Sequence, residues 1–328
     1  MSERRAVVLA GGLAYEREVS LRSGRRVVDA LRAVGLDADL LDADAQLLPT
    51  LVAHPADAVF IALHGATGED GSLRAVLELA GVPFVGTTAG SCRVAWDKPS
   101  AKGAIRAAGL LTPDWVALPH STFRELGAGA VLDLIVSRLG LPLMIKPAQG
   151  GSALGAERIS DPGELPAAMV GCFAYGDTVL IERFVEGTEV AVSVLDSGAG
   201  PVALPAVEIV PASGVFDYAA RYTAGMTTYH TPARLAPDVT DRVAALAVTA
   251  HQTMGLRDLS RTDAIVDALG EVHFLEVNVS PGMTETSMLP MSVAAAGLDL
   301  GTTLARLIDS SAARNRYTAR HSRLSTVD

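Results

Sequence analysis

Residues 5–110 alternate short apolar runs with amphipathic stretches, and this alternation restricts the possible fold more than any other feature of the chain. The apolar runs predict strands, and apolar residues three or four positions apart predict helices. Alternating strands and helices favour an open, mostly parallel sheet that binds ligands at the carboxyl ends of its strands. Gly11-Gly12 and His64-Gly65 both follow predicted strands. The predicted strands are 5–10, 37–41, 58–63 and 82–85, and the predicted helices are 20–31 and 73–79.

From about residue 111 the pattern changes to an α+β one. Short strands at 115–118 and 142–146 flank a predicted helix at 126–139. Strands at 177–184 and 189–195 are expected to pair with each other as a hairpin. Residues 212–232 lack periodicity, and a stretch of this length inside a compact domain is typical of a closing lid. A helix at 235–255 follows.

Composition narrows the class of protein. The 328 residues suffice for two or three domains, and 49% of them are hydrophobic. Cys92 and Cys172 do not make a disulfide framework, and the N-terminal apolar stretch is too short for a signal peptide. With a net charge of −10 and no long apolar run, we expect a cytoplasmic protein without nucleic-acid or membrane partners. Residues 313–328, rich in arginine, predict a mobile solvated tail.

A second hairpin carries the first chemical signal. Side chains two apart on a strand share a face, so Glu276 and Asn278 point the same way. If strands 261–266 and 271–278 meet in a turn centred between positions 269 and 270, Asp263 lies opposite Glu276. Such oxygen ligands suit Mg²⁺ bound beside substrate phosphates. The alternative is an acidic pair on a solvated face, but apolar neighbours mean that Glu276 needs a metal or a positive partner.

The lysines give a second signal. Of 27 basic residues only Lys98, Lys102 and Lys146 are lysines, which suggests positions that need a compact ammonium group. Lys146 ends a predicted strand and precedes the small-residue loop 147–155, whose free amides can wrap a phosphate. An ordinary hairpin loop is the alternative. The position of residues 147–155 directly after Lys146 favours a nucleotide-binding loop.

In order along the chain, these motifs resemble the D-alanine–D-alanine ligases of the ATP-grasp superfamily, over residues ~5–310. The resemblance implies an α/β N-terminal domain (1–110) and two α+β subdomains that clasp ATP (111–187 and 188–312), with residues 212–232 as a lid. It also implies a homodimer. The most specific motifs are Ala62-Leu-His-Gly-x3-Glu-Asp-Gly71, Arg261-x-Asp263 and Leu275-Glu-x-Asn-x-Ser-Pro-Gly-Met-Thr284.

The resemblance also implies the nucleotide site. Lys98 and Lys146 would hold the phosphates, backbone groups of residues 183 and 185 would read the adenine, and Glu189 would accept from the ribose. Two Mg²⁺ ions, with Mn²⁺ as a substitute, would bind Asp263, Glu276 and Asn278. For Glu189 the alternative is a cross-strand contact, and for Lys98 a solvated helix start. The full nucleotide set is Lys98, Lys146, Gly151, Ser152, Glu182, Arg183, Phe184, Val185, Glu189, Arg221 and Phe274.

The implied reaction joins two D-alanines through an acyl phosphate, because a carboxylate is a poor electrophile until it is phosphorylated. Arg261 and the Gly282 N–H would stabilise the oxyanion. The resemblance places Glu16, Ser152 and Tyr222 around the first substrate, His64 beside it, and Ser287 with Met288 at the second substrate. The alternative for His64 is a histidine satisfied at a strand end, and the alternative for Ser287 is a helix N-cap.

Several positions depart from the family pattern. Ala153 replaces a serine, Arg221 a lysine and Met288 a leucine, and bulky residues 13–15 precede Glu16. These changes leave other acceptors open: D-lactate, D-serine or an amino acid of secondary metabolism, including in an antibiotic-tolerant duplicate enzyme. A nucleotide-binding protein without catalysis is a further alternative, although the predicted metal ligands are all present.

Overall fold

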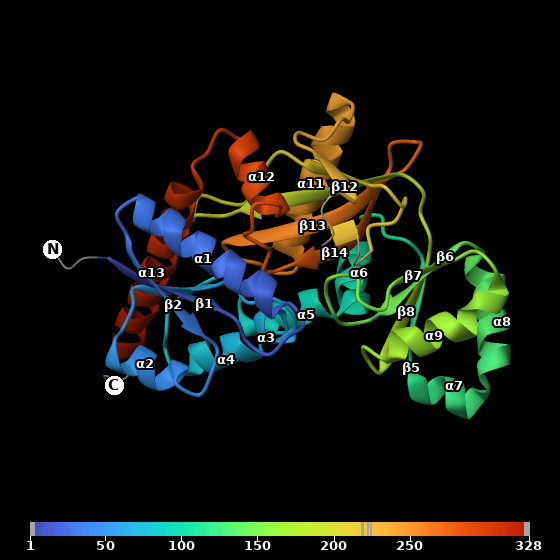
Figure 1. The fold of residues 1–328 in the computed structure, drawn as a ribbon, viewed down its shortest axis with the longest axis horizontal. Helices are drawn as coiled ribbons and strands as arrows, with labels where there is room; N and C mark the ends of the chain where they lie inside the picture. The colour runs from blue at the N-terminus through green and yellow to red at the C-terminus, as the bar shows by residue number, and fades with distance from the viewer. Residues whose placement is uncertain (1–3, 218–219, 222, 224, 325–328) are drawn as a thin grey trace.

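The computed structural model describes residues 4–217, 220–221, 223 and 225–324. Figure 1 shows three parts: an α/β domain together with the C-terminal helix at one end, a small sheet with three helices at the other, and a larger sheet between them. Of the predicted lid segment 212–232, residues 218, 219, 222 and 224 lie outside the described residues. The architecture agrees with the α/β and α+β class that the sequence predicts.

The N-terminal domain is a parallel sheet in the order β2-β1-β3-β4. Its inner strands β1 and β3 are buried apolar runs, as parallel strands covered on both faces require. The predicted parallel sheet is therefore confirmed. Its elements are β1 (Arg5–Ala10), α1 (Arg17–Ala33), β2 (Asp37–Asp42), α2 (Leu47–Ala53), β3 (Ala58–Ile61), α3 (Ala66–Glu69), α4 (Ser72–Leu79) and β4 (Phe84–Val85).

The last helix returns to this domain. Helix α13 (Leu300–Leu324) packs beside α1, and its residues Leu304, Leu307 and Ile308 are buried in the core under β1 and β3. The helix thus continues beyond residue 313, where the sequence predicts the start of a mobile tail. Arg314 is bound to the buried carboxylate of Asp258. The arginines of the tail therefore include at least one structural residue.

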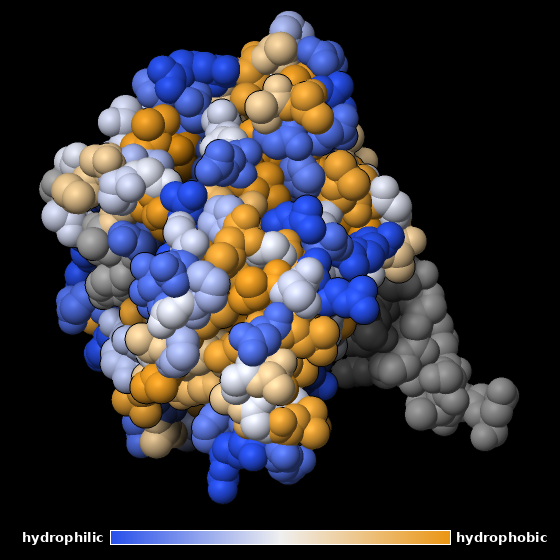
Figure 2. Space-filling model, turned by 90° about the vertical axis from the view of Figure 1, so that its right-hand side faces the viewer, coloured by the Kyte–Doolittle hydropathy of each residue, from blue (hydrophilic) through white to orange (hydrophobic). Residues whose placement is uncertain are grey.

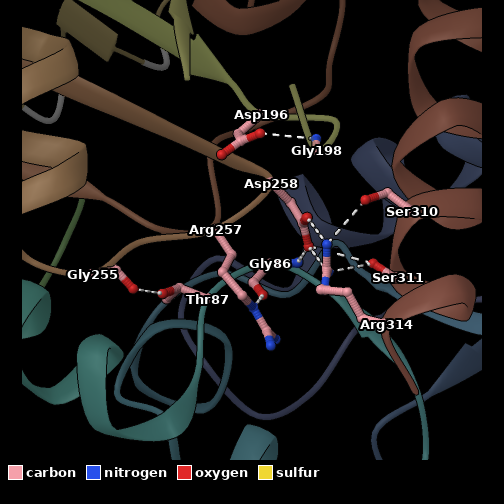
Figure 3. Close-up of polar contacts among 10 residues, drawn as sticks. All are labelled: Gly86, Thr87, Asp196, Gly198, Gly255, Arg257, Asp258, Ser310, Ser311 and Arg314. Carbon is pink, nitrogen blue, oxygen red and sulfur yellow. Dashed lines mark hydrogen bonds and ion pairs between the residues drawn. The ribbon is translucent and has the colours of Figure 1, made fainter. Parts of the chain in front are cut away.

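Asp258 joins three segments that are distant in the sequence (Figure 3). It is 1% exposed and accepts from the Gly86 N–H at 2.7 Å and from the two terminal guanidinium nitrogens of Arg314 at 2.7 and 2.6 Å. Beside it, Arg257 donates to the Gly86 carbonyl at 2.9 Å. This contact fixes the N-terminal domain and α13 to the larger sheet.

We expect Asp258→Asn to lower the free energy of unfolding by about 2–4 kcal/mol, because it removes the buried charge that Arg314 binds. Asparagine tolerates the left-handed φ of +64° at this position, so the backbone itself is not strained by the change. Urea denaturation measures the loss. The control is Asp309→Asn on α13, the helix that carries Arg314. It breaks an exposed ion pair with Arg4 near the N-terminus and should cost less than about 1 kcal/mol. Equal losses in the two variants would contradict this role.

The small sheet at the end opposite the N-terminal domain is antiparallel, in the order β5-β8-β6-β7. Helices on one side bury Phe123, Leu132 and Ile135 against it. Figure 2 shows the face of the molecule at this end, where apolar patches lie among hydrophilic side chains. Leu126 and Val170 of this part are exposed. Its elements are β5 (Trp115–Pro119), α7 (His120–Leu126), α8 (Ala128–Leu139), β6 (Leu143–Pro147), β7 (Glu157–Ile159), η1 (Pro162–Glu164), α9 (Leu165–Phe173) and β8 (Thr178–Arg183).

The larger sheet has the order β12-β11-β9-β13-β14, with β10 paired to β9. Helices α5 and α6, which the sequence places in the N-terminal domain, pack into the core of this sheet through Cys92, Ala95 and Ile105. The elements are α5 (Ala89–Trp96), α6 (Lys98–Ala107), β9 (Thr188–Leu195), β10 (Val202–Ala203), β11 (Val207–Pro211), β12 (Thr227–His230), α11 (Pro237–Thr253), β13 (Leu259–Val266), β14 (Val272–Asn278) and α12 (Met288–Ala295).

The expected hairpin between strands 177–184 and 189–195 is wrong. Strand β8 lies between β5 and β6, whereas β9 lies in the other sheet between β11 and β13. The four residues between them cross from one sheet to the other. A Cβ at Gly187 would come within 2.1 Å of the Val266 carbonyl oxygen, so glycine permits this close crossing.

In the part of the chain that the structure describes, no single helix has the length and apolar character of a membrane span. Helices α12 and α13 meet that test only as a pair, and a bend of 105° separates them.

Candidate active site

Two adjoining cavities lie where the three parts meet. The larger, of 560 Å³, lies between the small sheet (β5-β8-β6-β7) and the larger sheet. The smaller, of 350 Å³, reaches toward the N-terminal domain. The cavities share lining residues, so a group bound in one is next to a group bound in the other. The shared residues are Lys98, Gly150, Gly151, Phe216, Arg221 and Glu276.

The larger cavity combines apolar walls with charge at one end. Met144 and Ile209 line it from opposite sheets, and Leu275 lines it from strand β14. A slot of this size with a few charged groups suits a planar base attached to an anionic tail. Of the predicted nucleotide residues, those that line it are Lys98, Lys146, Gly151, Glu182, Arg183, Phe184, Val185, Glu189 and Arg221.

Phe274 does not line this cavity. It is fully buried in the core of the larger sheet, under α11. The reason is a bulge at Leu275: Asp263 pairs with Glu276, but Ala264 pairs with Phe274, so one residue of β14 is unmatched. Because adjacent residues of β13 face opposite sides, their partners Glu276 and Phe274 also face opposite sides.

The bulge also corrects the reasoning behind the predicted pair. Val266 lies opposite Val272, so the turn is centred on position 269, half a residue earlier than expected. Without the bulge that centre would pair Asp263 with position 275. The extra residue restores Glu276 as the partner. The predicted cross-strand pair of Asp263 and Glu276 is therefore confirmed, although by a different route.

The three predicted metal donors lie together at the end of this hairpin, and each already has a protein partner. Asp263 accepts two bonds from Arg261, at 2.7 and 2.8 Å. Glu276 lies 3.5 Å from the Lys98 ammonium, and the Asn278 side-chain oxygen accepts from the Ser280 N–H at 2.7 Å. Within the described residues no three His, Cys, Asp or Glu side chains form a metal site by themselves.

An oxygen-only set of two carboxylates and one amide nevertheless fits Mg²⁺, which takes few protein ligands and completes its shell with phosphate and water. A carboxylate retains lone pairs beyond those used by Arg261 or Lys98. Burial raises the pKa of Glu276, but the charges of Lys98, Lys146, Arg221 and Arg261 outweigh it and hold that pKa at about 2. Glu276 is therefore ionised at neutral pH, as a metal ligand must be.

The small-residue loop after β6 brings Lys98 and Glu16 to the same place. Lys98 begins helix α6, where Asp97 caps the helix, and its ammonium donates to the Gly150 carbonyl at 2.6 Å. Ser152 donates to the Glu16 carboxylate at 2.9 Å. Ser152 and Ala153 both adopt left-handed φ angles of 56° and 55°. Strained backbone of this kind in consecutive non-glycine residues concentrates at ligand-binding loops.

His64 lines the smaller cavity as a neutral, fixed side chain. Its Nδ1 lies 3.1 Å from the Ser280 carbonyl, so Nδ1 carries the proton, and Nε2 accepts from the Ser23 hydroxyl at 3.1 Å. Ser23 in turn accepts from the Met283 N–H. Burial lowers the pKa of His64 to about 4, against the opposing effect of the Ser280 carbonyl, and Arg261 lowers it further. His64 thus ties the N-terminal domain to the loop 280–284.

This network makes stability depend on pH. Between pH 6.5 and about 4 the unfolded chain binds a proton that the folded His64 does not, so the free energy of unfolding falls as the pH falls. We expect wild-type protein to lose about 3 kcal/mol more than His64→Gln between pH 7 and pH 4. Denaturant titrations at several pH values measure the difference, with the exposed His54→Gln as the control. Parallel curves for wild type and His64→Gln would contradict the assignment.

The loop after β14 forms the far wall of the smaller cavity. Ser287 is the N-cap of α12, and its hydroxyl accepts from the Thr284 N–H at 3.0 Å rather than from its own helix. A Cβ at Gly282 would come within 2.6 Å of that hydroxyl, so a side chain there would displace Ser287. Met288 follows and is buried against Phe216 of the lid segment. Tyr222 lies outside the described residues.

Four further charged residues, at or behind the cavities, were given no role from the sequence. Glu69 lines the smaller cavity and accepts from the Gly65 N–H; burial raises its pKa to about 7, with the nearby charge of Glu16 acting in the same direction. Glu208 and Arg234 form a bidentate pair at the larger cavity. Lys102 is wholly buried behind it. Two of these residues could have been found from the sequence, because Glu69 is part of the motif 62–71 and Lys102 is one of only three lysines. No sequence feature points to Glu208 or Arg234.

The geometry defines the class of protein. A parallel-sheet domain is followed by two antiparallel-sheet parts, and the latter enclose a cavity lined by Lys98, Lys146 and several carboxylates. This is the ATP-grasp fold, and a TM-score of 0.77 relates the chain to an ATP complex of D-alanine–D-alanine ligase from Bacillus anthracis, at 27% identity over 96% of this chain and 99% of that one.

Sequence comparison gives the family. Residues 104–309 match the family model of the D-ala D-ala ligase C-terminus, and residues 43–87 match that of the N-terminus. A D-alanine–D-alanine ligase of Anaeromyxobacter sp. strain K is 40% identical over 94% of this chain and 97% of its own. The VanG D-Ala:D-Ser ligase of Enterococcus faecalis is similar in structure, with a TM-score of 0.80 and 27% identity over 94% of this chain and 100% of that one. The chain belongs to the D-alanine–D-alanine ligase family.

Proposed function

We propose that this protein uses ATP to join two molecules of D-alanine into D-alanyl-D-alanine, a precursor of peptidoglycan, through an acyl-phosphate intermediate. One observation carries the proposal: the lysine-lined cavity and the smaller cavity share Lys98 and Glu276. A terminal phosphate bound in the first is then adjacent to a carboxylate bound in the second. That adjacency is what in-line phosphoryl transfer to a carboxylate requires.

In the larger cavity the adenine would lie between the two sheets, against Phe184 and Val185. The Arg183 N–H is already bound to the Asp114 carbonyl, so the Val185 N–H is the better donor to the base. Glu189 would accept from the ribose. Lys98, Lys146 and Arg221 line the end at which the phosphates would lie.

Asp263, Glu276 and Asn278 would hold two Mg²⁺ ions, with Mn²⁺ as a substitute. When bound, the metal would neutralise charge on the transferred phosphate. The protein itself supplies positive charge from Lys98 and Arg261, which flank these carboxylates.

In the smaller cavity Glu16 would bind the ammonium of the first D-alanine, with Ser152 and Tyr222 completing the contact. His64 would lie beside this substrate. Arg261 and the Gly282 N–H would donate to the oxyanion that develops when the second amine attacks and phosphate leaves. Ser287, with Met288 behind it, would receive the carboxylate of the second substrate.

We place the reaction in the cytoplasm, where ATP is available, and we propose a homodimer as the assembly. The substrates named here require neither nucleic acid nor membrane.

The test is ADP release from ATP across a panel of D- and L-amino acids and D-lactate. The proposal predicts that D-alanine alone supports turnover and that the product is the dipeptide. The similarity to a D-Ala:D-Ser ligase makes D-serine the second acceptor to measure. If ADP is released from D-alanine only when D-serine or D-lactate is also present, the product joins D-alanine to that acceptor and is not D-alanyl-D-alanine. Nucleotide binding without ADP release for any pair would reject catalysis.

A further inference from the structure

Lys102 is the most deeply buried cation of the site, although it touches neither cavity. It lies one helical turn after Lys98 in α6 and has no exposed surface. Its ammonium lies 2.9 Å from Glu182 Oε2 and donates to the Thr112 hydroxyl at 2.6 Å. Thr112 passes a hydrogen bond on to the Phe274 carbonyl at 2.8 Å. Lys102 is therefore held in one position.

Glu182 is shared between two lysines. Its Oε1 lies 2.5 Å from the Lys146 ammonium, while its Oε2 faces Lys102. Glu182 is 2% exposed, so its charge must be balanced by protein groups or by bound ligand. Of the two lysines, Lys146 lines the larger cavity and Lys102 does not.

This arrangement places two positive charges against one buried negative charge. If only Lys146 were present, moving it toward a phosphate would leave Glu182 ionised in a dry environment, which is costly. With Lys102 in place, Glu182 keeps a counter-charge after Lys146 moves. Burial lowers the pKa of Lys102 to about 8, and the charge of Glu182 opposes that effect, so the pair also maintains the ammonium form.

We propose that Lys102 is a positioning residue for nucleotide binding: it neutralises Glu182 so that Lys146 can leave that carboxylate and bind a nucleotide phosphate. The inference rests on the proposed ATP site and adds a role for a residue that contacts no substrate. It also accounts for the third lysine in a chain that otherwise uses arginine.

Lys102→Met, Glu182→Gln and the double variant test this in the full-length protein. We expect Lys102→Met to raise the KM for ATP and the calorimetric Kd for Mg·ADP about tenfold or more, the effect of losing one charge-assisted contact. The KM for D-alanine should change less than about twofold, since Lys102 does not line the smaller cavity. In the Glu182→Gln background, Lys102→Met should have no further effect on nucleotide binding, because Lys146 is no longer bound to a carboxylate.

Additive effects in the two backgrounds, or an unchanged Kd in the single variant, would overturn the proposal. The double variant buries no unpaired carboxylate, so its comparison with Glu182→Gln decides the matter even if Lys102→Met alone fails to fold. Nucleotide binding is measured without amino acids. A wild type that binds Mg·ADP but makes no dipeptide would therefore reject the proposed function without rejecting this role.

Discussion

Arg261→Lys is expected to lower kcat about 10²–10³-fold, the cost of removing one preorganised donor from an oxyanion site. Arg261 is 7% exposed, lines the smaller cavity and is fixed by two hydrogen bonds to Asp263. Lysine keeps the charge, so Asp263 retains a counter-ion. Lysine lacks the planar guanidinium group, which in arginine can bind the Asp263 carboxylate and face the substrate at the same time. Steady-state dipeptide synthesis measures the change.

The matched control is Arg242→Lys, which alters an exposed arginine paired with Asp238 on α11. It should leave kcat within about twofold. The thermal unfolding of both variants shows whether the fold is retained. A kcat for Arg261→Lys within about threefold of wild type, in a folded protein, would remove Arg261 from the catalytic group.

Glu276→Gln is expected to lower kcat by at least about 10²-fold, because a metal at a transferred phosphate contributes several kcal/mol. The substitution keeps the shape of the side chain but removes the charge that faces both cavities and lies 3.5 Å from Lys98. The variant should also require a higher Mg²⁺ concentration for half-maximal rate. Rates measured over a range of Mg²⁺ concentrations separate the loss of metal binding from a loss of fold.

Glu271→Gln is the control for this variant, since Glu271 is an exposed residue near the turn of the same hairpin. It should leave both kcat and the Mg²⁺ dependence unchanged. If Glu276→Gln lowers kcat but keeps the wild-type Mg²⁺ dependence, Glu276 acts by charge alone and is not a metal ligand.

Local rules predicted what depends on neighbours in the chain. The alternation of residues 5–85 was enough for the parallel sheet, because the inner strands β1 and β3 are apolar runs that must be covered on both faces. The pair Asp263 and Glu276 followed from strand pairing. Phe274 did not, because a bulge at Leu275 reverses the side of the strand on which it lies, and no residue type near Leu275 signals a bulge.

Features that depend on distant packing were not predictable. Strand β8 is next to β9 in the sequence, but each finds its partners in a different sheet, since both edges of β8 are taken by β5 and β6. Lys102 was visible as one of three lysines, yet its burial beside Glu182 depends on α6 lying against β14. Arg314 looked like part of a solvated tail, because its partner Asp258 is 56 residues away.

In the proposed reaction a D-alanine carboxylate takes the terminal phosphate of ATP before the second amine attacks it. D-alanine labelled with ¹⁸O in its carboxylate tests this directly, with ³¹P NMR of the inorganic phosphate as the readout. The structure predicts one ¹⁸O atom in the phosphate for each dipeptide made, because the oxygen that joins carbon to phosphorus departs with phosphorus. Unlabelled phosphate accompanying dipeptide formation would contradict the mechanism.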